Sequence, residues 1–257
     1  MAGGPQMSSF EPIDFYNDAQ TGRTRGERGL ESREKIAIRA IQNLKGGSVL
    51  DIGCGSGFFL RNLEQNLPHS AFELQGVDFS NFEIERAKKD PRHSRIGFTQ
   101  ANAEKGLDFP ENHFDVVFSG EVIEHLYDPD TFLDQIFRIL KPGGMLVLTT
   151  PNLLSWFNRL LALIGIQPVT YEASVRDSKI GFGFLKSLKK DSLPAGHIRL
   201  MSYLAVRDIV RQAGFKELKF HGSLFEQAPG VFLWIDRLFR GFPSLASGLV
   251  VIAKKPL

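Results

Sequence analysis

The sequence predicts an α/β protein built on a doubly wound, mostly parallel sheet of seven strands, with helices on both faces and an inserted cap. Three observations support this fold class. Short apolar runs alternate with helix-like segments, a glycine-rich turn joins the first run to its helix, and the alternation stops after Pro151. We therefore expect an N-terminal arm at residues 1–30 and a single domain over 31–257, with the cap at about 151–200.

The individual elements follow from local patterns. A helix is expected over 31–44, where apolar residues recur at helical spacing until Gly46 and Gly47 end it. Strands are predicted at 48–52, 71–78, 96–100, 114–119, 144–150, 215–223 and 247–254. Further helices are predicted at 58–67, 81–89, 129–140 and 202–213. This order of elements is typical of a Rossmann-like fold.

The expected cap differs from the rest of the chain. Its first part, 153–166, is interrupted by Asn158 and Arg159 and indicates a buried or interfacial amphipathic helix, while 166–200 shows no clear period. The second part is basic. Its cations suit an acidic acceptor or an anionic membrane surface, although a solvated loop is the ordinary explanation of such charges. These cations are Arg176, Lys179, Lys186, Lys189, Lys190 and Arg199.

Composition bounds the class of protein. The 257 residues are 42% hydrophobic and 23% charged, which excludes a mainly disordered, collagen-like or disulfide-stapled chain. A net charge of +2 does not by itself indicate a nucleic-acid-binding protein. The one cysteine, Cys54, cannot form an internal disulfide. The N-terminus lacks the pattern of a signal peptide, and no apolar run reaches the ~20 residues of a membrane span, so we expect a cytoplasmic protein.

The glycine-rich turn predicts a ligand site. The strand at 48–52 leads directly into Gly53-Cys54-Gly55-Ser56-Gly57, and a helix follows. Glycines at such a junction permit a sharp turn and close approach of a ligand, and the N-terminus of the helix offers unpaired N–H groups. We expect a nucleotide-sized ligand at the C-terminal edge of the sheet.

The spacing of the glycines narrows the choice of nucleotide. A dinucleotide fingerprint needs a small residue at position 58, where this chain has Phe58, and a phosphate-binding P-loop would end in Gly-Lys-Ser/Thr. Both patterns are absent, so NAD(P) and ATP are disfavoured. Asp78, at the end of the second strand, is placed to accept hydrogen bonds from ribose hydroxyls.

Five ordered segments resemble the class I S-adenosylmethionine-dependent methyltransferases: VLDIGCGSG, GVDFS, QANAE, FDVVFSGEVIEHL and LKPGGMLVLTTPN. The resemblance is strong over residues 35–152 and weaker over 196–215. It implies S-adenosylmethionine as cofactor, with Asp78 at the ribose, Asn102 and Ala103 at the adenine, and Glu121 near the methionine end. The full set of implied cofactor-binding residues is Asp51, Gly53, Cys54, Gly55, Gly57, Asp78, Phe79, Asn102, Ala103 and Glu121. Each of these residues could also serve only the local turn or, for Cys54, only packing.

A second group of residues suggests the chemistry. Glu121, Glu124 and His125 follow the fourth strand at i, i+3 and i+4, which on a helical turn puts them on one face. With His197 they could bind a divalent metal. The run EVIEH also resembles ubiquinone-pathway O-methyltransferases and small-RNA 2′-O-methyltransferases, some of which use a metal there. His125, Glu124 and His197 are the candidate catalytic residues, and three roles stay open: a metal site, a general base or an ordered helix end.

Together these observations predict methyl transfer from S-adenosylmethionine to a small-molecule acceptor, at oxygen. The acceptor is expected to be apolar or anionic, of a lipid, isoprenoid or glycan type. Two alternatives stay open: an RNA 2′-O-methyltransferase, and a non-catalytic cofactor-binding regulatory protein. The sequence contains no appended RNA-binding module, which speaks against nucleic acid as a partner. Peripheral membrane contact and the oligomeric state are left open.

Overall fold

A computed structural model describes residues 29–67, 71–189, 193–226, 228 and 230–257. The predicted N-terminal arm therefore lies almost wholly outside the described residues, as do Lys190 and Asp191 of the basic segment.

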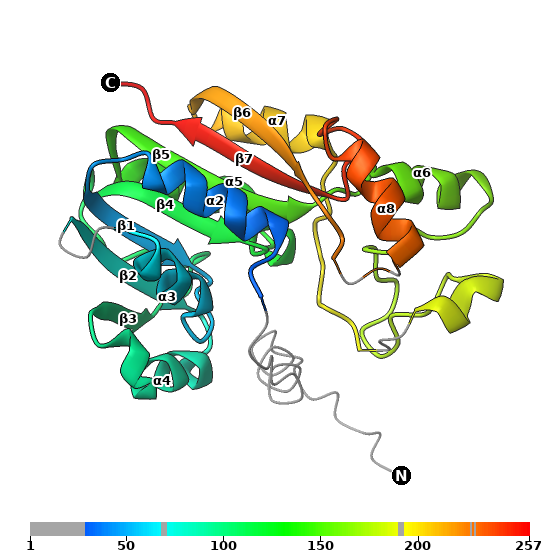
Figure 1. Ribbon diagram of the computed structural model, residues 1–257, viewed down its shortest axis with the longest axis horizontal. Coiled ribbons are helices and arrows are strands. Elements are labelled where there is room, and N and C mark those ends of the chain that lie inside the picture. The colour runs from blue at the N-terminus through cyan, green and yellow to red at the C-terminus, as the bar shows by residue number, and fades with distance from the viewer. Residues whose placement is uncertain (1–28, 68–70, 190–192, 227, 229) are drawn as a thin grey trace, which may run out of the picture.

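The centre of the molecule is one seven-stranded sheet in the order β3-β2-β1-β4-β5-β7-β6 (Figure 1). Strands β1 to β5 run parallel, whereas β7 is antiparallel to both β5 and β6. The predicted mostly parallel α/β sheet is confirmed. The strands are β1 Gly47–Ile52, β2 Phe72–Asp78, β3 Ile96–Gln100, β4 Phe114–Gly120, β5 Leu140–Pro151, β6 Lys216–Ser223 and β7 Gly248–Lys254.

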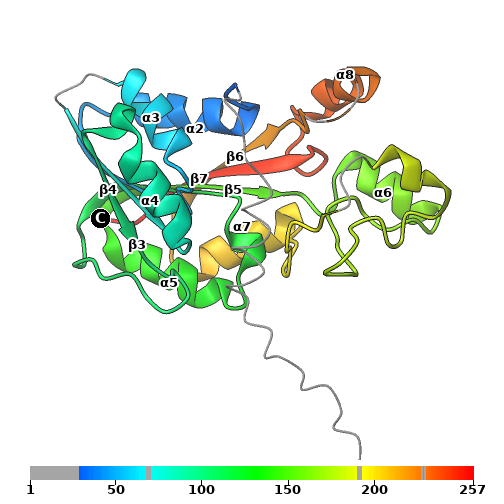
Figure 2. The ribbon, with the colours of Figure 1, turned by 90° about the horizontal axis from the view of Figure 1, so that it is seen from below.

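Helices cover both faces of this sheet, as predicted. The buried residues form two clusters, one under α2, α3 and α4 and the other under α5 and α7. Figure 2 shows α2 and α3 on the opposite side of the sheet from α5 and α7. These helices are α2 Ser32–Gln42, α3 Phe58–Gln65, α4 Asn81–Lys89, α5 Pro129–Ile139 and α7 Tyr203–Gln212.

Local sequence explains where two of these helices begin. Ser80 precedes α4, and its hydroxyl accepts a hydrogen bond from the N–H of Glu83. Asp128 precedes α5, and its carboxylate accepts from the N–H of Thr131, while Pro129 occupies the first turn. These two N-terminal helix caps fix the backbone just after β2 and β4, the strands that carry the candidate site.

The cap region projects from one end of the sheet as a lobe (Figure 2). It contains α6 Trp156–Leu163 and the 3₁₀ helix η3 Gly183–Leu188, so the helix predicted over 153–166 is shorter than expected. The lobe also contains α8 Gly230–Phe239, which the sequence analysis did not assign. Trp156 of α6 packs against Phe232 and Phe239 of α8, with ring centroids 4.9 and 5.3 Å apart. The segment after β6 therefore belongs to the same lobe as the predicted cap.

Candidate functional site

The predicted ligand-binding loop lies at the carboxyl end of β1, where the strand order turns from β2 on one side to β4 on the other. In such sheets this position opens a crevice for ligands. The N–H groups of Gly53 and Cys54 both donate to the carbonyl oxygen of Val77 at the end of β2. Gly53 and Gly55 have φ angles of 78° and 51°, a left-handed conformation that other residues rarely adopt.

The glycines of this loop meet different surroundings. A side chain at Gly53 would collide with Val122, whereas the direction of a side chain at Gly55 is open for 4 Å. Gly53 is thus needed for packing of the loop against the segment after β4. Gly55 leaves space next to the loop, in the crevice.

Asp78 fastens the loop to the end of β2. Its Oδ2 accepts a hydrogen bond from the N–H of Gly55, and its Oδ1 accepts from the N–H of Ser80, both at 2.8 Å. Burial raises the pKa of Asp78, and these two N–H groups oppose that shift. Burial also raises the pKa of Asp51 well above its usual value, with contributions from the nearby carboxylates of Asp78 and Glu34. The loop is therefore bordered by two closely spaced acidic groups.

The other expected cofactor residues lie at the same edge of the sheet. Asn102 and Ala103 follow β3, but the Asn102 Oδ1 accepts from the N–H of Glu104, so the side chain serves a turn. Phe79 follows β2, and its carbonyl oxygen accepts from the Gln100 side chain. Cys54 is buried beneath the loop, and burial raises the pKa of its thiol. Its side chain therefore belongs to the core, where the thiol also donates to the carbonyl oxygen of Gly55.

Glu121 does not lie as the sequence predicted. We expected one helical face to carry Glu121, Glu124 and His125, but Glu121 has a left-handed φ of 59° and the short 3₁₀ helix η2 spans only Ile123–His125. The carboxylate of Glu121 accepts from the Thr149 hydroxyl at 2.9 Å and lies 3.7 Å from the Arg33 guanidinium. The predicted helical turn is therefore wrong, and Glu121 faces α2 and β5 instead.

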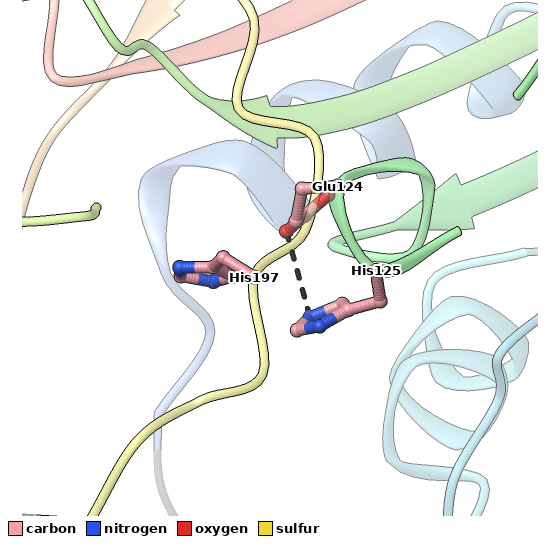
Figure 3. A group of neighbouring side chains, drawn as sticks. All are labelled: Glu124, His125 and His197. Atoms are coloured by element: carbon pink, nitrogen blue, oxygen red, sulfur yellow. Dashed lines mark ion pairs between the residues drawn. The ribbon is translucent and has the colours of Figure 1, made fainter. Parts of the chain in front are cut away.

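Glu124, His125 and His197 do come together, although His197 lies in a distant part of the chain. The carbonyl oxygen of Gly196, the residue before His197, is bonded to His125. One potential ligand atom from each of the three lies within 4.8 Å of the others (Figure 3). Glu124 is completely buried. Its Oε2 accepts from the Thr150 hydroxyl at 3.0 Å, whereas its Oε1 lies 3.9 Å from His125 Nε2 and has no hydrogen-bond partner within the part of the chain that the structure describes.

Backbone carbonyl groups orient both histidines. His125 Nδ1 lies 3.0 Å from the carbonyl oxygen of Gly196, and His197 Nδ1 lies 2.8 Å from that of Thr170. Because a carbonyl oxygen only accepts, both Nδ1 atoms carry the hydrogen. Burial and the neighbouring His197 lower the pKa of His125 to about 4, so this ring is neutral at pH 7 with its lone pair at Nε2.

Residues 195–199 of the cap, which we call the strap, hold His197 against the sheet. The N–H groups of Ile198 and Arg199 both donate to the carbonyl oxygen of Glu124, at 2.8 and 2.9 Å. Glu172 accepts hydrogen bonds from three consecutive N–H groups, those of Ala195, Gly196 and His197. The backbone of residues 195–199 is therefore hydrogen-bonded both to the carbonyl oxygen of Glu124 and to the carboxylate of Glu172.

Two of the predicted basic residues of the cap have internal roles. Lys189 Nζ donates to the carbonyl oxygens of Val169 and Ser178, and the Arg199 guanidinium donates to that of Tyr127. The Lys189 side chain thus links two parts of the cap, and the Arg199 side chain links the cap to the loop after η2.

Sequence reasoning missed several residues of the site. Arg33, in the first turn of α2, pairs with Glu31 at 2.6 Å and approaches Glu121, so the helix expected only to lead into the domain begins at the site. Thr150 of β5 and Glu172 of the cap were also missed. A threonine at the end of a strand and an acid in an aperiodic segment carry no local signal of such contacts.

Comparison with known proteins identifies the family. A family model described as a methyltransferase domain matches residues 27–219. The ubiquinone biosynthesis O-methyltransferase of Bradyrhizobium diazoefficiens is 36% identical over 134 residues, which are 51% of this chain and 50% of that protein. The demethylmenaquinone methyltransferase of Lactococcus lactis is 38% identical over 113 residues, 43% of this chain and 44% of that protein. The chain spans about half the length of the curated relatives it matches.

Solved structures share the fold at low sequence identity. A methyltransferase from Mesorhizobium loti that depends on S-adenosylmethionine superposes with a TM-score of 0.55 at 18% identity, covering 87% of this chain and 98% of that one. Phosphoethanolamine N-methyltransferase 2 of Haemonchus contortus, in complex with S-adenosyl-L-methionine, gives 0.56 at 18% identity, covering 98% and 59%. With the family model matched over most of the chain, and the glycine loop and Asp78 at the expected edge of the sheet, this chain belongs to the class I S-adenosylmethionine-dependent methyltransferases.

Proposed function

We propose that this chain binds S-adenosylmethionine at the glycine loop and methylates an oxygen atom of a small-molecule acceptor with the help of a divalent cation. The observation that carries the proposal is the buried Glu124 Oε1, which has no hydrogen-bond partner among the described residues and points toward two histidines. A buried polar atom without a partner is costly unless a ligand satisfies it.

The residues of the loop suit the cofactor. Gly55 leaves open space beside the backbone, the Asp78 carboxylate accepts a hydrogen bond from the Gly55 N–H, and the buried Asp51 carboxylate lies close enough to Asp78 to raise its own pKa. A positively charged sulfonium with an amino group and ribose hydroxyls complements such acidic acceptors. The cofactor supplies a methyl group on a good leaving group, so the main task of the protein is to hold the acceptor atom in line with it. We assign Asp78 to the ribose and leave Asn102 and Ala103 as adenine contacts.

We assign the cation to Glu124, His125 and His197. Two imidazoles and one carboxylate are a donor set that suits Zn²⁺, Mn²⁺ or Fe²⁺. Histidine ligands of metals almost always donate their other ring N–H to a carbonyl or carboxylate, as both rings do here. A bound cation would favour the ionised form of an acceptor hydroxyl. Glu121 lies outside this group, but its place beside Arg33 and Thr149 is consistent with a contact to the methionine end.

The proposed acceptor is a phenol with an apolar tail. The curated relatives are named for ubiquinone and menaquinone synthesis, and a hydroxyl group bound next to a cation is a suitable target for O-methylation. In the absence of a cation, neutral His125 could itself accept the proton of the hydroxyl, although a base with a pKa of about 4 is weak.

Removal of metal tests the proposal. Purified protein treated with chelator is expected to retain its affinity for S-adenosylmethionine and to lose turnover of apolar phenols, followed as S-adenosylhomocysteine formation by mass spectrometry. Addition of Zn²⁺ or Mn²⁺ is expected to restore turnover. Full turnover in the chelated protein, with no metal retained by elemental analysis, would assign the chemistry to His125 alone.

Glu172→Gln is expected to weaken cation binding by about 10-fold to 100-fold, because second-shell groups orient metal ligands. The carboxylate now accepts hydrogen bonds from three N–H groups. Glutamine has only one oxygen acceptor, and its NH₂ group is a donor that cannot accept from them. Titration calorimetry of metal-free protein with Zn²⁺ measures the change. Glu111→Gln, at an exposed position before β4, is the matched control. Equal affinities in the two variants would reduce Glu172 to a structural role.

A further inference from the structure

Helix α8 is apolar on two opposite sides. Phe232, Asp236 and Phe239 face the rest of the lobe. Asp236 is fully buried there and accepts hydrogen bonds from Trp156, Phe225 and Ser247. Val231, Trp234 and Leu238 lie on the other side at helical spacing, and their exposed fractions are 75%, 62% and 58%. A helix on the surface of a protein ordinarily turns a polar side to water, so the outer side of α8 requires an explanation.

Other segments of the same lobe also expose large apolar side chains. Leu160, Leu163 and Ile164, at the end of α6, are exposed by 54%, 82% and 61%, and Phe242, just after α8, by 62%. Because α6 and α8 pack against each other through aromatic side chains, these residues belong to one lobe. We name as the apolar face the exposed apolar residues of α8 itself, Val231, Trp234 and Leu238. Exposed apolar patches of this kind mark interaction sites.

The charges beside the apolar face have one sign. Arg237 and Arg240 are exposed on or just after α8, and within the described residues neither guanidinium pairs with a carboxylate. The one acid of α8, Asp236, is turned into the lobe. A second copy of the chain related by twofold symmetry would bring like charges together. An anionic surface would neutralise them.

We propose that the apolar face docks on an anionic lipid bilayer, with α8 lying in the plane of the interface. Tryptophan and arginine suit the boundary between headgroups and acyl chains, where the ring is partly buried and the guanidinium contacts phosphate. The helices of the described residues include none that could span a bilayer. Methyl transfer is not required for this docking.

If the acceptor is the apolar phenol of the proposed function, docking would bring the cap to the membrane in which that acceptor dissolves. The lobe that carries the apolar face is continuous with the strap that carries His197 and is bonded to Glu124. An apolar acceptor dissolved in the bilayer could therefore reach the cap without passing through water.

Vesicle flotation tests the proposal, with the full chain and vesicles of phosphatidylcholine with or without phosphatidylglycerol. We expect flotation with the anionic vesicles. The double variant Trp234→Glu, Leu238→Glu is expected to lower the bound fraction by about tenfold or more, and Arg237→Glu, Arg240→Glu to remove the dependence on anionic lipid. Phe82→Glu, at an exposed apolar position on α4, is the control and is expected to float like the wild type.

Fluorescence provides a readout of insertion. The chain contains two tryptophans, and we expect anionic vesicles to shift the emission of Trp234 to the blue. Trp234→Phe should still float but lose that shift, because Trp156 stays hydrogen-bonded within the lobe. Absence of flotation in the wild type, or equal flotation of wild type and the Trp234→Glu, Leu238→Glu variant, would overturn the proposal. A wild-type dimer that this variant converts to a monomer, without vesicle binding, would assign the apolar face to self-association. None of these outcomes bears on cofactor binding or turnover.

Discussion

Glu124→Gln and His125→Ala are each expected to lower turnover by about 100-fold to 10,000-fold, because each removes a group that would hold the cation or accept a proton at the acceptor. Their affinity for S-adenosylmethionine should stay at the wild-type value, since neither side chain borders the glycine loop. Glutamine fills the space of Glu124 without a buried carboxylate, whose burial now raises its pKa well above the usual value. Glu124→Gln should therefore unfold at the wild-type temperature or above it.

The measurements are initial rates with an apolar phenol and calorimetry with S-adenosylmethionine. His113→Ala is the matched control, because this histidine lies before β4, at the opposite edge of the sheet. The rate of this variant should equal that of the wild type at temperatures at which both proteins are folded. Wild-type rates in both Glu124→Gln and His125→Ala would leave the cluster with only an architectural role.

Asp78→Asn is expected to weaken S-adenosylmethionine binding by at least about tenfold, the usual cost of losing hydrogen bonds to a charged group. The carboxylate accepts from the N–H groups of Gly55 and Ser80 at once, and asparagine can replace only one of these acceptors. The variant should therefore lose both the shape of the loop and the charge proposed to face the ribose. Titration calorimetry below the unfolding transition measures the affinity.

Asp115→Asn separates loss of stability from loss of the ligand site. Asp115 also accepts a hydrogen bond from a backbone N–H, that of Ser48, but it lies at the amino end of β4, away from the glycine loop. This variant should be less stable than the wild type and bind the cofactor normally. If Asp78→Asn and Asp115→Asn bind equally well, Asp78 does not belong to the cofactor site.

The sequence was sufficient to predict most of the sheet. Every predicted strand is present, because buried parallel strands are short apolar runs and the helices between them are amphipathic. The antiparallel place of β7 between β5 and β6 could not be read from its apolar pattern, which fits either direction. Helix α8 lies in the segment after β6 that the sequence analysis left unassigned, although its residues show helical periodicity.

For the candidate site, the sequence predicted the types of residue better than their geometry. The glycine loop and Asp78 meet at the carboxyl edge of the sheet, as the order of strands predicted, because the turn between a parallel strand and the next helix is determined locally. Glu121 departs from its predicted face because a left-handed residue after β4 interrupts the turn. His197 joins Glu124 and His125 through the fold of a long aperiodic segment, and Glu172, which holds that segment, could only be found in three dimensions.

The strap is attached to Glu124 through backbone atoms alone, since the bonds run from the amides of Ile198 and Arg199 to the carbonyl oxygen of that residue. The side chain of Ile198 can therefore be exchanged without loss of these bonds, whereas the Arg199 side chain also donates to the carbonyl oxygen of Tyr127. A lineage of such proteins could alter the lining of the cap, and with it the choice of acceptor, while the three clustered residues stay unchanged. Substrate preference and chemistry would then evolve as separate traits on one scaffold.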